Sequence, residues 1–246
     1  MSTDSTVIGC IVPVFNGARY LRETLDSILA QTYRPLEVIV ADDGSTDDTA
    51  AIADSYGPPV RRIWQPNSGV AAARNLGVTH TRGAFIAFLD ADDLWHAEKL
   101  ERQMQRFTAH PDLGMSMTHL QNFWIPELQH EAERLRDHRV AQPIVGYSLP
   151  GLLVRRTVID AVGPFDVTRQ HTSEEEWFLR ARRLGVAIEM LPEVLASRRL
   201  HDANTSRLDS AGSVDEFLHL LKDHLDSGRR QAVTPPQTPG KTQGDT

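Results

Sequence analysis

Short apolar segments alternate with amphipathic segments through the first half of the chain. The apolar segments are rich in β-branched residues, as expected for strands that are buried on both faces of a parallel sheet. They occupy residues 7–14, 36–41, 60–64 and 84–89. Between them, apolar residues recur at the spacing of a helix with one buried face, at about 17–30, 70–78 and 94–109. This alternation predicts an α/β fold with a mostly parallel central sheet and flanking helices.

The second half has a mixed pattern. Residues 124–142 are polar and without a clear period, which indicates a surface excursion or a lid. The elements expected after it are a helix from about Ser173, two short strands at 186–191 and 194–199, and a helix at 217–225. Residues 228–246 are rich in Pro, Thr and Gly, a composition that predicts a disordered tail.

Composition and net charge exclude some classes of function. The 246 residues carry 26 basic and 33 acidic side chains and a net charge of −7, without a basic cluster, which argues against a primary nucleic-acid binder. The single cysteine, Cys10, excludes an internal disulfide. We expect a cytoplasmic protein without a membrane span, because no signal-peptide pattern or apolar stretch of roughly 20 residues is present.

Three polar clusters follow predicted strands, at residues 13–16, 42–45 and 90–93. Ligands of open parallel sheets bind at the carboxyl ends of the strands, so these clusters are expected to converge. Asp90, Asp92 and Asp93 offer oxygen ligands that suit Mg²⁺ or Mn²⁺. The alternative is an acidic turn that caps the following helix.

The other clusters suggest a nucleotide site. Asp42 could bind a base or ribose, while Gly44 supplies a turn with positive φ and Ser45 caps the next helix. Residues 67–69 begin another helix with small side chains, and Arg74 on that helix could reach a phosphate. The residues that follow a predicted strand near the end, Arg198, Arg199, His201 and Asn204, could hold phosphate or complete a metal site.

The helix from Ser173 supplies a candidate general base. Glu174 precedes Trp177 and Phe178 by three and four residues and shares their apolar face, which would raise its pKa. The alternative is an acidic first turn favoured by the helix dipole. Glu176 is expected to pair with Arg180 on the outer side.

Together these segments resemble the family-two inverting glycosyltransferases of GT-A fold, which use nucleotide-activated sugars. The resemblance covers residues 7–207 and is carried by VPVFNGARYL, VIVADDGSTDDT, NSGVAAARNLG, GAFIAFLDADD, GPFD, EEEWFLRARRLG and RRLHDANTSR. It implies one domain over 1–227, with a nucleotide-binding part at about 7–123 and an acceptor-side part at about 124–210.

The resemblance also implies roles for individual residues. Those at the nucleotide are Pro13, Asn16, Asp42, Arg74 and Asp90. Asp92 with Asp90 would hold the divalent cation, Mn²⁺ or Mg²⁺, and Glu174 would be the catalytic base. Further candidates are Asp93, Glu175, Arg199 and His201.

One departure from the family pattern bears on the base. Ser173 stands where the family usually has the first of two acids, and Glu174 stands where Asp is commoner, so Glu175 is the alternative base. Uridine diphosphate sugars are the commonest donors in the family, with thymidine and guanosine donors left open, and the hydroxyl acceptor is unknown.

Two other function classes compete with this one. A non-catalytic nucleotide-sugar-binding protein would keep the cleft without turnover, and a nucleotidyltransferase would also use acidic metal ligands. The loop after the first strand lacks the Gly- and Arg/Lys-rich phosphate signature that a nucleotidyltransferase would need.

Overall fold

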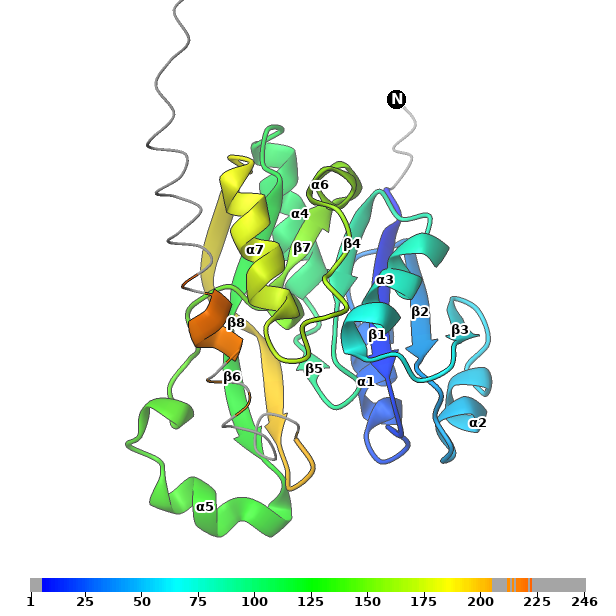
Figure 1. The fold of residues 1–246 in the computed structure, drawn as a ribbon, viewed down its shortest axis with the longest axis vertical. Coiled ribbons are helices and arrows are strands. Elements are labelled where there is room, and N and C mark those ends of the chain that lie inside the picture. The colour runs from blue at the N-terminus through cyan, green and yellow to red at the C-terminus, as the bar shows by residue number, and fades with distance from the viewer. Residues whose placement is uncertain (1–5, 205–211, 213, 215, 221, 223–246) are drawn as a thin grey trace, which may run out of the picture.

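The computed structural model describes residues 6–204, 212, 214, 216–220 and 222. The first half forms a parallel sheet from β1 (Ile8–Val14), β2 (Leu36–Asp42), β3 (Val60–Trp64) and β4 (Phe85–Phe88). The connecting helices are α1 (Leu21–Leu29), α2 (Thr49–Asp54) and α3 (Val70–His80). These four strands are the ones that the apolar pattern predicts, and they lie in the right-hand part of Figure 1.

The second half extends the same sheet. Its strands are β5 (Leu94–Trp95), β6 (Met115–Trp124), β7 (Leu153–Arg155) and β8 (Ile188–Leu200), and its helices include α4 (Lys99–Ala109), α6 (Arg156–Val162) and α7 (Ser173–Arg183). In the described residues the sheet has eight strands in the order β3-β2-β1-β4-β7-β6-β8-β5. Four of the seven strand pairs in this described part are parallel, which confirms the mostly parallel sheet.

Two apolar clusters cover the two faces of the sheet. Successive side chains of a strand point to opposite faces. In β1, Cys10 and Val12 therefore join the cluster on the side of α1 and α4, while Ile11 joins the cluster with α3, α6 and α7. Both faces of β1 are buried, which explains why its sequence is a continuous apolar run.

A surface excursion connects β6 to β7. It contains η1 (Pro126–Leu128), α5 (Gln129–Arg134), η2 (Arg139–Ala141) and η3 (Leu149–Gly151). None of the residues in η1, α5 and η2 is buried, which confirms a surface segment and agrees with its projection below the sheet in Figure 1. The last turn, η3, is fully buried.

Several predicted boundaries are wrong. Ser45 does not cap a helix: α2 begins at Thr49, and the Ser45 hydroxyl instead accepts a hydrogen bond from the backbone N–H of Asn16. The short strand β5 separates the acidic loop from α4, because it pairs with β8. The two strands predicted between 186 and 199 form the single strand β8.

The chain end is described only in part. Residues 216–220 are helical, and the rest of the predicted 217–225 helix and the predicted tail lie largely or wholly outside the described residues. Within the described part of the chain, no helix is both long enough and apolar enough to cross a bilayer.

Candidate active site

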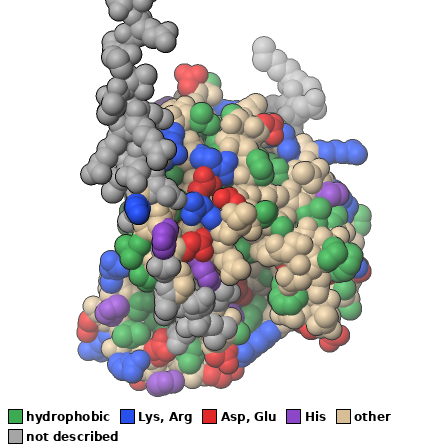
Figure 2. All heavy atoms as spheres, viewed as in Figure 1, with side chains coloured by type: hydrophobic (Ala, Val, Ile, Leu, Met, Phe, Trp, Pro, Cys, Tyr) green, Lys and Arg blue, Asp and Glu red, His purple; other side chains and the backbone are tan. Residues whose placement is uncertain are grey.

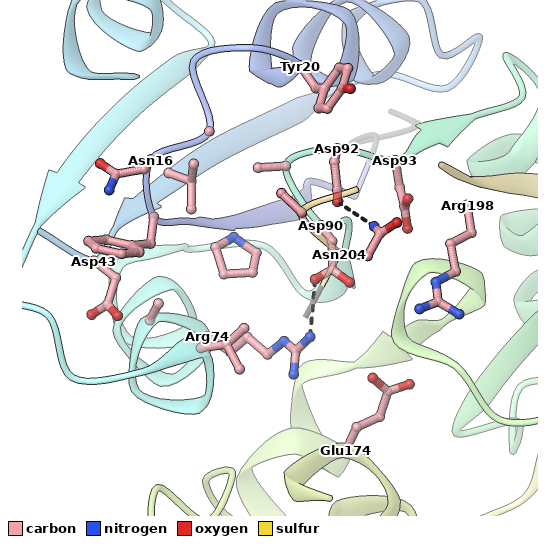
Figure 3. A pocket seen from close by; sticks show the side chains of 18 of the residues that line it. Asn16, Tyr20, Asp43, Arg74, Asp90, Asp92, Asp93, Glu174, Arg198 and Asn204 are labelled. Carbon is pink, nitrogen blue, oxygen red and sulfur yellow. Dashed lines mark hydrogen bonds and ion pairs between the residues drawn. The ribbon is translucent and has the colours of Figure 1, made fainter. Parts of the chain in front are cut away.

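A cavity of about 700 Å³ lies at the carboxyl ends of the parallel strands. The loops after β1, β2 and β4, the helices α3 and α7, and the end of β8 contribute its walls (Figure 3). Acidic and basic side chains gather over α7, the helix that borders this cavity (Figure 2). The three polar clusters that the sequence places at strand ends therefore do meet in space.

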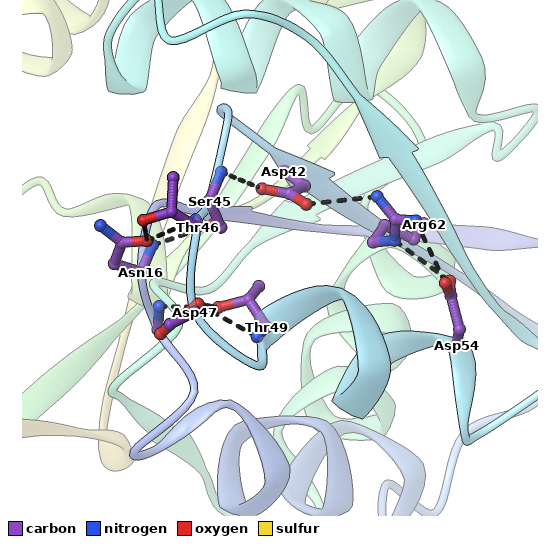
Figure 4. A network of polar contacts seen from close by, with 9 residues as sticks. Asn16, Asp42, Ser45, Thr46, Asp47, Thr49, Asp54 and Arg62 are labelled. Carbon is purple, nitrogen blue, oxygen red and sulfur yellow. Dashed lines mark hydrogen bonds and ion pairs between the residues drawn. The ribbon is translucent and has the colours of Figure 1, made fainter.

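The loops after β1 and β2 hold each other in place (Figure 4). Asn16 adopts φ of 51°, and its side-chain oxygen accepts a hydrogen bond from the Thr46 backbone N–H at 2.8 Å. The Asn16 N–H donates to Ser45 Oγ at 2.9 Å. Pro13 and Asn16 both line the cavity, but the Asn16 side chain is already engaged in shaping its wall.

Asp42 and Asp43 are adjacent carboxylates with different surroundings. Asp42 is 1% exposed, pairs with Arg62 at 3.2 Å, accepts from the Ser45 N–H at 2.9 Å, and does not line the cavity. Asp43 does line it. Asp42 is expected to contact a ligand, but of the two carboxylates Asp43 is the one at the cavity wall.

The position of the strand end explains this difference. Asp42 is the last residue of β2, in register with Val14, so its side chain is enclosed by neighbouring strands. Asp43 is the first residue beyond the strand and accepts hydrogen bonds from the backbone N–H groups of Ser68 (2.9 Å) and Gly69 (2.8 Å). The apolar pattern ends at Ala41 and gives no sign that the strand continues through Asp42, so it does not distinguish the two aspartates.

The acidic loop after β4 brings four of the expected residues together. Asp90 pairs with the buried Arg74 at 3.1 Å. Asp92 contacts His201 Nε2 at 2.8 Å and accepts a hydrogen bond from the Asn204 amide at 3.3 Å. Burial, followed by the charge of Asp90, raises the pKa of Asp92.

Asp93 and Arg199 link the acidic loop to β8. Asp93 lines the cavity but is only 3% exposed, and its Oδ1 accepts the Arg199 backbone N–H at 2.9 Å. Burial raises the pKa of Asp93 well above its ordinary value. The Arg199 side chain donates to the Asp92 carbonyl at 2.8 Å and pairs with Glu23 at 2.8 Å.

Arg199 itself does not line the cavity, whereas its neighbour Arg198 does. The two residues lie near the end of β8, where successive side chains alternate between faces. Arg199, for which the sequence predicts a ligand contact, instead holds the acidic loop in this structure. Tyr20, which sequence reasoning missed, also lines the cavity, with its ring 4.9 Å from that of His201.

Glu174 points into the cavity from the first turn of α7, opposite the acidic loop (Figure 3). Its Oε1 accepts the Leu149 backbone N–H at 2.7 Å. Burial raises the pKa of Glu174 to about 7; Asp90 adds to the rise, and Arg74 opposes it. The expected rise is thus confirmed.

The neighbours of Glu174 have separate positions. Glu175 also lines the cavity, is more exposed, and has a pKa raised by partial burial. Ser173 is buried at the cavity wall. Glu176 pairs with Arg180 at 2.8 Å, as the helical spacing predicts.

The residues present fit a divalent cation that shares its coordination with a ligand. Among the described residues, no three His, Cys, Asp or Glu side chains form a ready-made metal cage. Asp90 and Asp92 nevertheless both line the cavity, two residues apart in the loop after β4. Such a site suits a hard cation that takes its remaining ligands from a phosphate group.

Comparison with known proteins shows one family. The family model described as Glycosyl transferase family 2 matches residues 10–175. An uncharacterized glycosyltransferase of Rickettsia typhi is 32% identical over 245 residues, which cover 94% of this chain and 76% of the relative.

Two solved structures show the fold. S. aureus TarS 1-349 in complex with UDP-GlcNAc has a TM-score of 0.65 at 19% identity, over 80% of this chain and 59% of that chain. The mannosyltransferase PcManGT from Pyrobaculum calidifontis, in complex with GDP-Man and Mn²⁺, has a TM-score of 0.61 at 20% identity, over 93% of this chain and 66% of that chain. The chain thus spans about three fifths to two thirds of these neighbours, and the GT-A fold class is confirmed.

Proposed function

This chain belongs to glycosyl transferase family 2, and from that premise we propose that its cleft transfers a sugar from a nucleoside-diphosphate sugar to an acceptor hydroxyl with inversion at the anomeric carbon. One observation carries the proposal. Glu174, with a pKa raised to about 7, faces the Asp90–Asp93 loop across one cavity of about 700 Å³. The space between them is large enough for the sugar and diphosphate of a donor.

The nucleotide would lie against the loops after β1 and β2. Phe15 lines the cavity and is 52% exposed, so its ring offers a face on which a base can stack. Asp43 offers a carboxylate to a base N–H group. The TarS structure holds UDP-GlcNAc and the PcManGT structure holds GDP-Man; we propose a uridine donor for this chain, with guanosine as the alternative.

Asp92 and Asp90 would hold Mn²⁺ or Mg²⁺ at the diphosphate, as the oxygen-rich wall favours. When bound, the cation would supply charge neutralisation for the departing diphosphate. His201 orients the Asp92 carboxylate through its contact at 2.8 Å. Arg74, paired with Asp90, would add positive charge at the same end of the cavity.

Glu174 would act as the general base. Its carboxylate removes the proton of the acceptor hydroxyl while that oxygen bonds to the anomeric carbon. In the same step the bond from this carbon to the phosphate oxygen breaks, and the nucleoside diphosphate leaves with the bonding electron pair. A base with a pKa near 7 is half-ionised at neutral pH, which suits proton transfer there.

The donor site is tested by calorimetric titration with UDP and GDP, with and without Mn²⁺. We expect Mn²⁺-dependent binding of UDP that is weakened at least about tenfold in Asp92→Ala. Asp112→Ala is the matched control, because Asp112 is exposed and does not line the cavity. If neither nucleotide bound under either condition, the proposed donor site would be wrong.

The base is tested separately. We expect Glu174→Gln to bind UDP as the wild type does and to lose transfer by at least about a hundredfold. Normal turnover in Glu174→Gln would contradict the assignment and point to Glu175, for which Glu175→Gln is the corresponding variant. Donor binding without transfer or donor hydrolysis in the wild type would favour a non-catalytic binding protein.

A further inference from the structure

We propose that Trp95, Lys99 and Gln103 are positioning residues that hold the Glu174 carboxylate in place through the turn η3. The inference rests on the base role proposed above for Glu174. Trp95 ends β5, and Lys99 and Gln103 lie in the first turns of α4; the three residues are 5%, 0% and 0% exposed. All three side chains are buried and contact η3 or the residue that follows it.

Each of the three side chains donates to a different carbonyl of one short segment. Trp95 Nε1 donates to the Pro150 carbonyl at 2.8 Å, Gln103 Nε2 to that of Gly151 at 2.9 Å, and Lys99 Nζ to that of Leu152 at 3.2 Å. Three consecutive carbonyls are thus fixed by side chains that come from a different part of the chain.

The three donors are also linked to one another and to the sheet. Gln103 Oε1 accepts a hydrogen bond from Lys99 Nζ at 2.9 Å, and its Nε2 also donates to the Ser116 carbonyl in β6 at 2.8 Å. The Lys99 ammonium lies 4.3 Å from the centre of the Trp95 ring. A change in one member therefore disturbs the positions of the others.

The turn transmits this placement to the cavity. Leu149, its first residue, donates its N–H to Glu174 Oε1 at 2.7 Å. The turn has little freedom to shift toward β6, because a Cβ added at Gly151 would lie 2.6 Å from the Thr118 carbonyl oxygen. The Leu149 N–H that donates to Glu174 is therefore held in place by contacts of its turn with α4 and with β6.

Burying the Lys99 amine costs free energy that filling the same space with an apolar side chain would not. Burial lowers its pKa to about 7, and its hydrogen-bond acceptors are the neutral oxygens of Gln103 and Leu152. A methionine of similar length would fill the same space without the cost of burying an amine. A costly polar group that supports the turn beside the proposed base is typical of a site that loses stability in return for orientation.

The test measures the Leu149 amide by NMR in the full chain, with no donor or acceptor needed. In the wild type its chemical shift should follow the ionisation of Glu174, with a midpoint near 7, and this titration should be absent in Glu174→Gln. The other charged groups that face Glu174, which are Arg74, Asp90 and Glu175, are left unchanged in every positioning variant.

The variants are Lys99→Met, Gln103→Met and Trp95→Phe, of which the last keeps its ring and loses a single hydrogen bond. We expect the Leu149 amide to exchange with solvent about tenfold faster or more in these variants. The Glu174 midpoint should also rise, because the N–H bond that favours the carboxylate is weakened. Gln31→Met is the matched control: Gln31 is a buried glutamine that contacts α4 through His96 and Leu100 but does not contact η3.

The outcomes are distinct. Faster exchange and a raised midpoint in the three variants, with wild-type values in Gln31→Met, would support the proposal. Wild-type values in all three variants would overturn it, as would an equal change in the control.

Global damage is separated by thermal unfolding at pH 6, where Lys99→Met should be no less stable than the wild type, since it removes a buried amine that is charged below its pKa of about 7. Normal transfer by Glu174→Gln would overturn the base role alone, and the amide data would still show whether the carboxylate is held.

Discussion

At the scale of single residues, several carboxylates lie at or next to the cavity, and each has different surroundings. Asp42 is paired and enclosed, Asp43 faces the cavity, and Asp92 is oriented by His201. Glu174 is disfavoured as an anion by burial and by Asp90. Residues of one chemical type thus acquire separate roles from their surroundings.

The first prediction concerns pH. Because Glu174 must be ionised to accept a proton and has a pKa of about 7, turnover should fall roughly tenfold for each pH unit below 7 and level off above it. The measurement is the pH dependence of kcat/KM with the donor identified by titration. A profile that stays flat from pH 5.5 to 8 would contradict the base assignment.

The same group affects stability with a defined sign. Its folded pKa of about 7 lies above the ordinary value of 4.5, so its contribution to stability is present below pH 4.5 and is lost as pH rises through 7. Glu174→Gln should therefore gain stability relative to the wild type at pH 8 but not at pH 4.5, as thermal unfolding at the two pH values would show.

The second prediction compares the two adjacent carboxylates. Asp43→Asn should weaken UDP binding about tenfold or more, because the carboxylate at the cavity wall is lost, and should also lower the free energy of unfolding, because Asp43 is buried and accepts hydrogen bonds from the backbone of Ser68 and Gly69. Asp42→Asn should leave binding nearly unchanged and lower the free energy of unfolding by about 1–2 kcal/mol, because the buried pair with Arg62 is lost. Calorimetry and denaturant unfolding separate the two effects, and the reverse pattern would restore Asp42 as the ligand contact.

At the scale of elements, close packing of helix on sheet sets the position of α3 and hence of Arg74. Gly77 lies in α3 above Ile11, and a Cβ added there would lie 2.4 Å from Ile11 Cγ2. Both residues are buried, so neither can move without disturbing β1. The small residue therefore serves packing, although a glycine inside a helix is unfavourable by propensity.

Gly77→Ala should consequently destabilise the protein by about 1–3 kcal/mol, the usual cost of overpacking a well-filled core. Helix propensity alone predicts the opposite, a gain of about 1 kcal/mol. Thr79→Ala is the control on the same helix, since Thr79 is exposed, and should change stability by about 0.5 kcal/mol or less. Denaturant unfolding of both variants gives the comparison, and a more stable Gly77→Ala would show that α3 can shift outward.

At the scale of the whole molecule, one sheet runs through both halves of the chain. β4 pairs with β1 on one side and with β7 on the other, so the two halves share backbone hydrogen bonds through a central strand. The cavity lies between them, with Phe15, Asp43 and the acidic loop contributed by the first half and Glu174 by α7 of the second.

This continuity predicts a single cooperative unfolding transition, as expected for one domain over 1–227. Far-UV circular dichroism and tryptophan fluorescence should report the same midpoint, because Trp95 and Trp177 lie in the clusters on opposite faces of the sheet. Two separated midpoints would contradict the single domain and indicate that the halves unfold independently.

Local sequence patterns predicted much of this architecture. Apolar runs located β1, β2, β3 and β4, because strands buried on both faces leave a continuous signal. The spacing of apolar residues on α7 also placed Glu174 beside Trp177 and Phe178 and predicted its raised pKa. The ends of elements were less well predicted, as Ser45 shows, because capping depends on which loop a polar side chain meets.

The sequence by itself determined the fold class, the family resemblance and the convergence of acidic side chains at one edge of the sheet, since each depends on local order along the chain. Only the tertiary structure decided which member of a pair faces the cavity, Asp43 rather than Asp42 and Arg198 rather than Arg199. It also decided that Trp95, Lys99 and Gln103 support the turn beneath Glu174. These outcomes depend on strand register and on contacts between distant segments, and the direction in which a side chain points reverses with every residue along a strand.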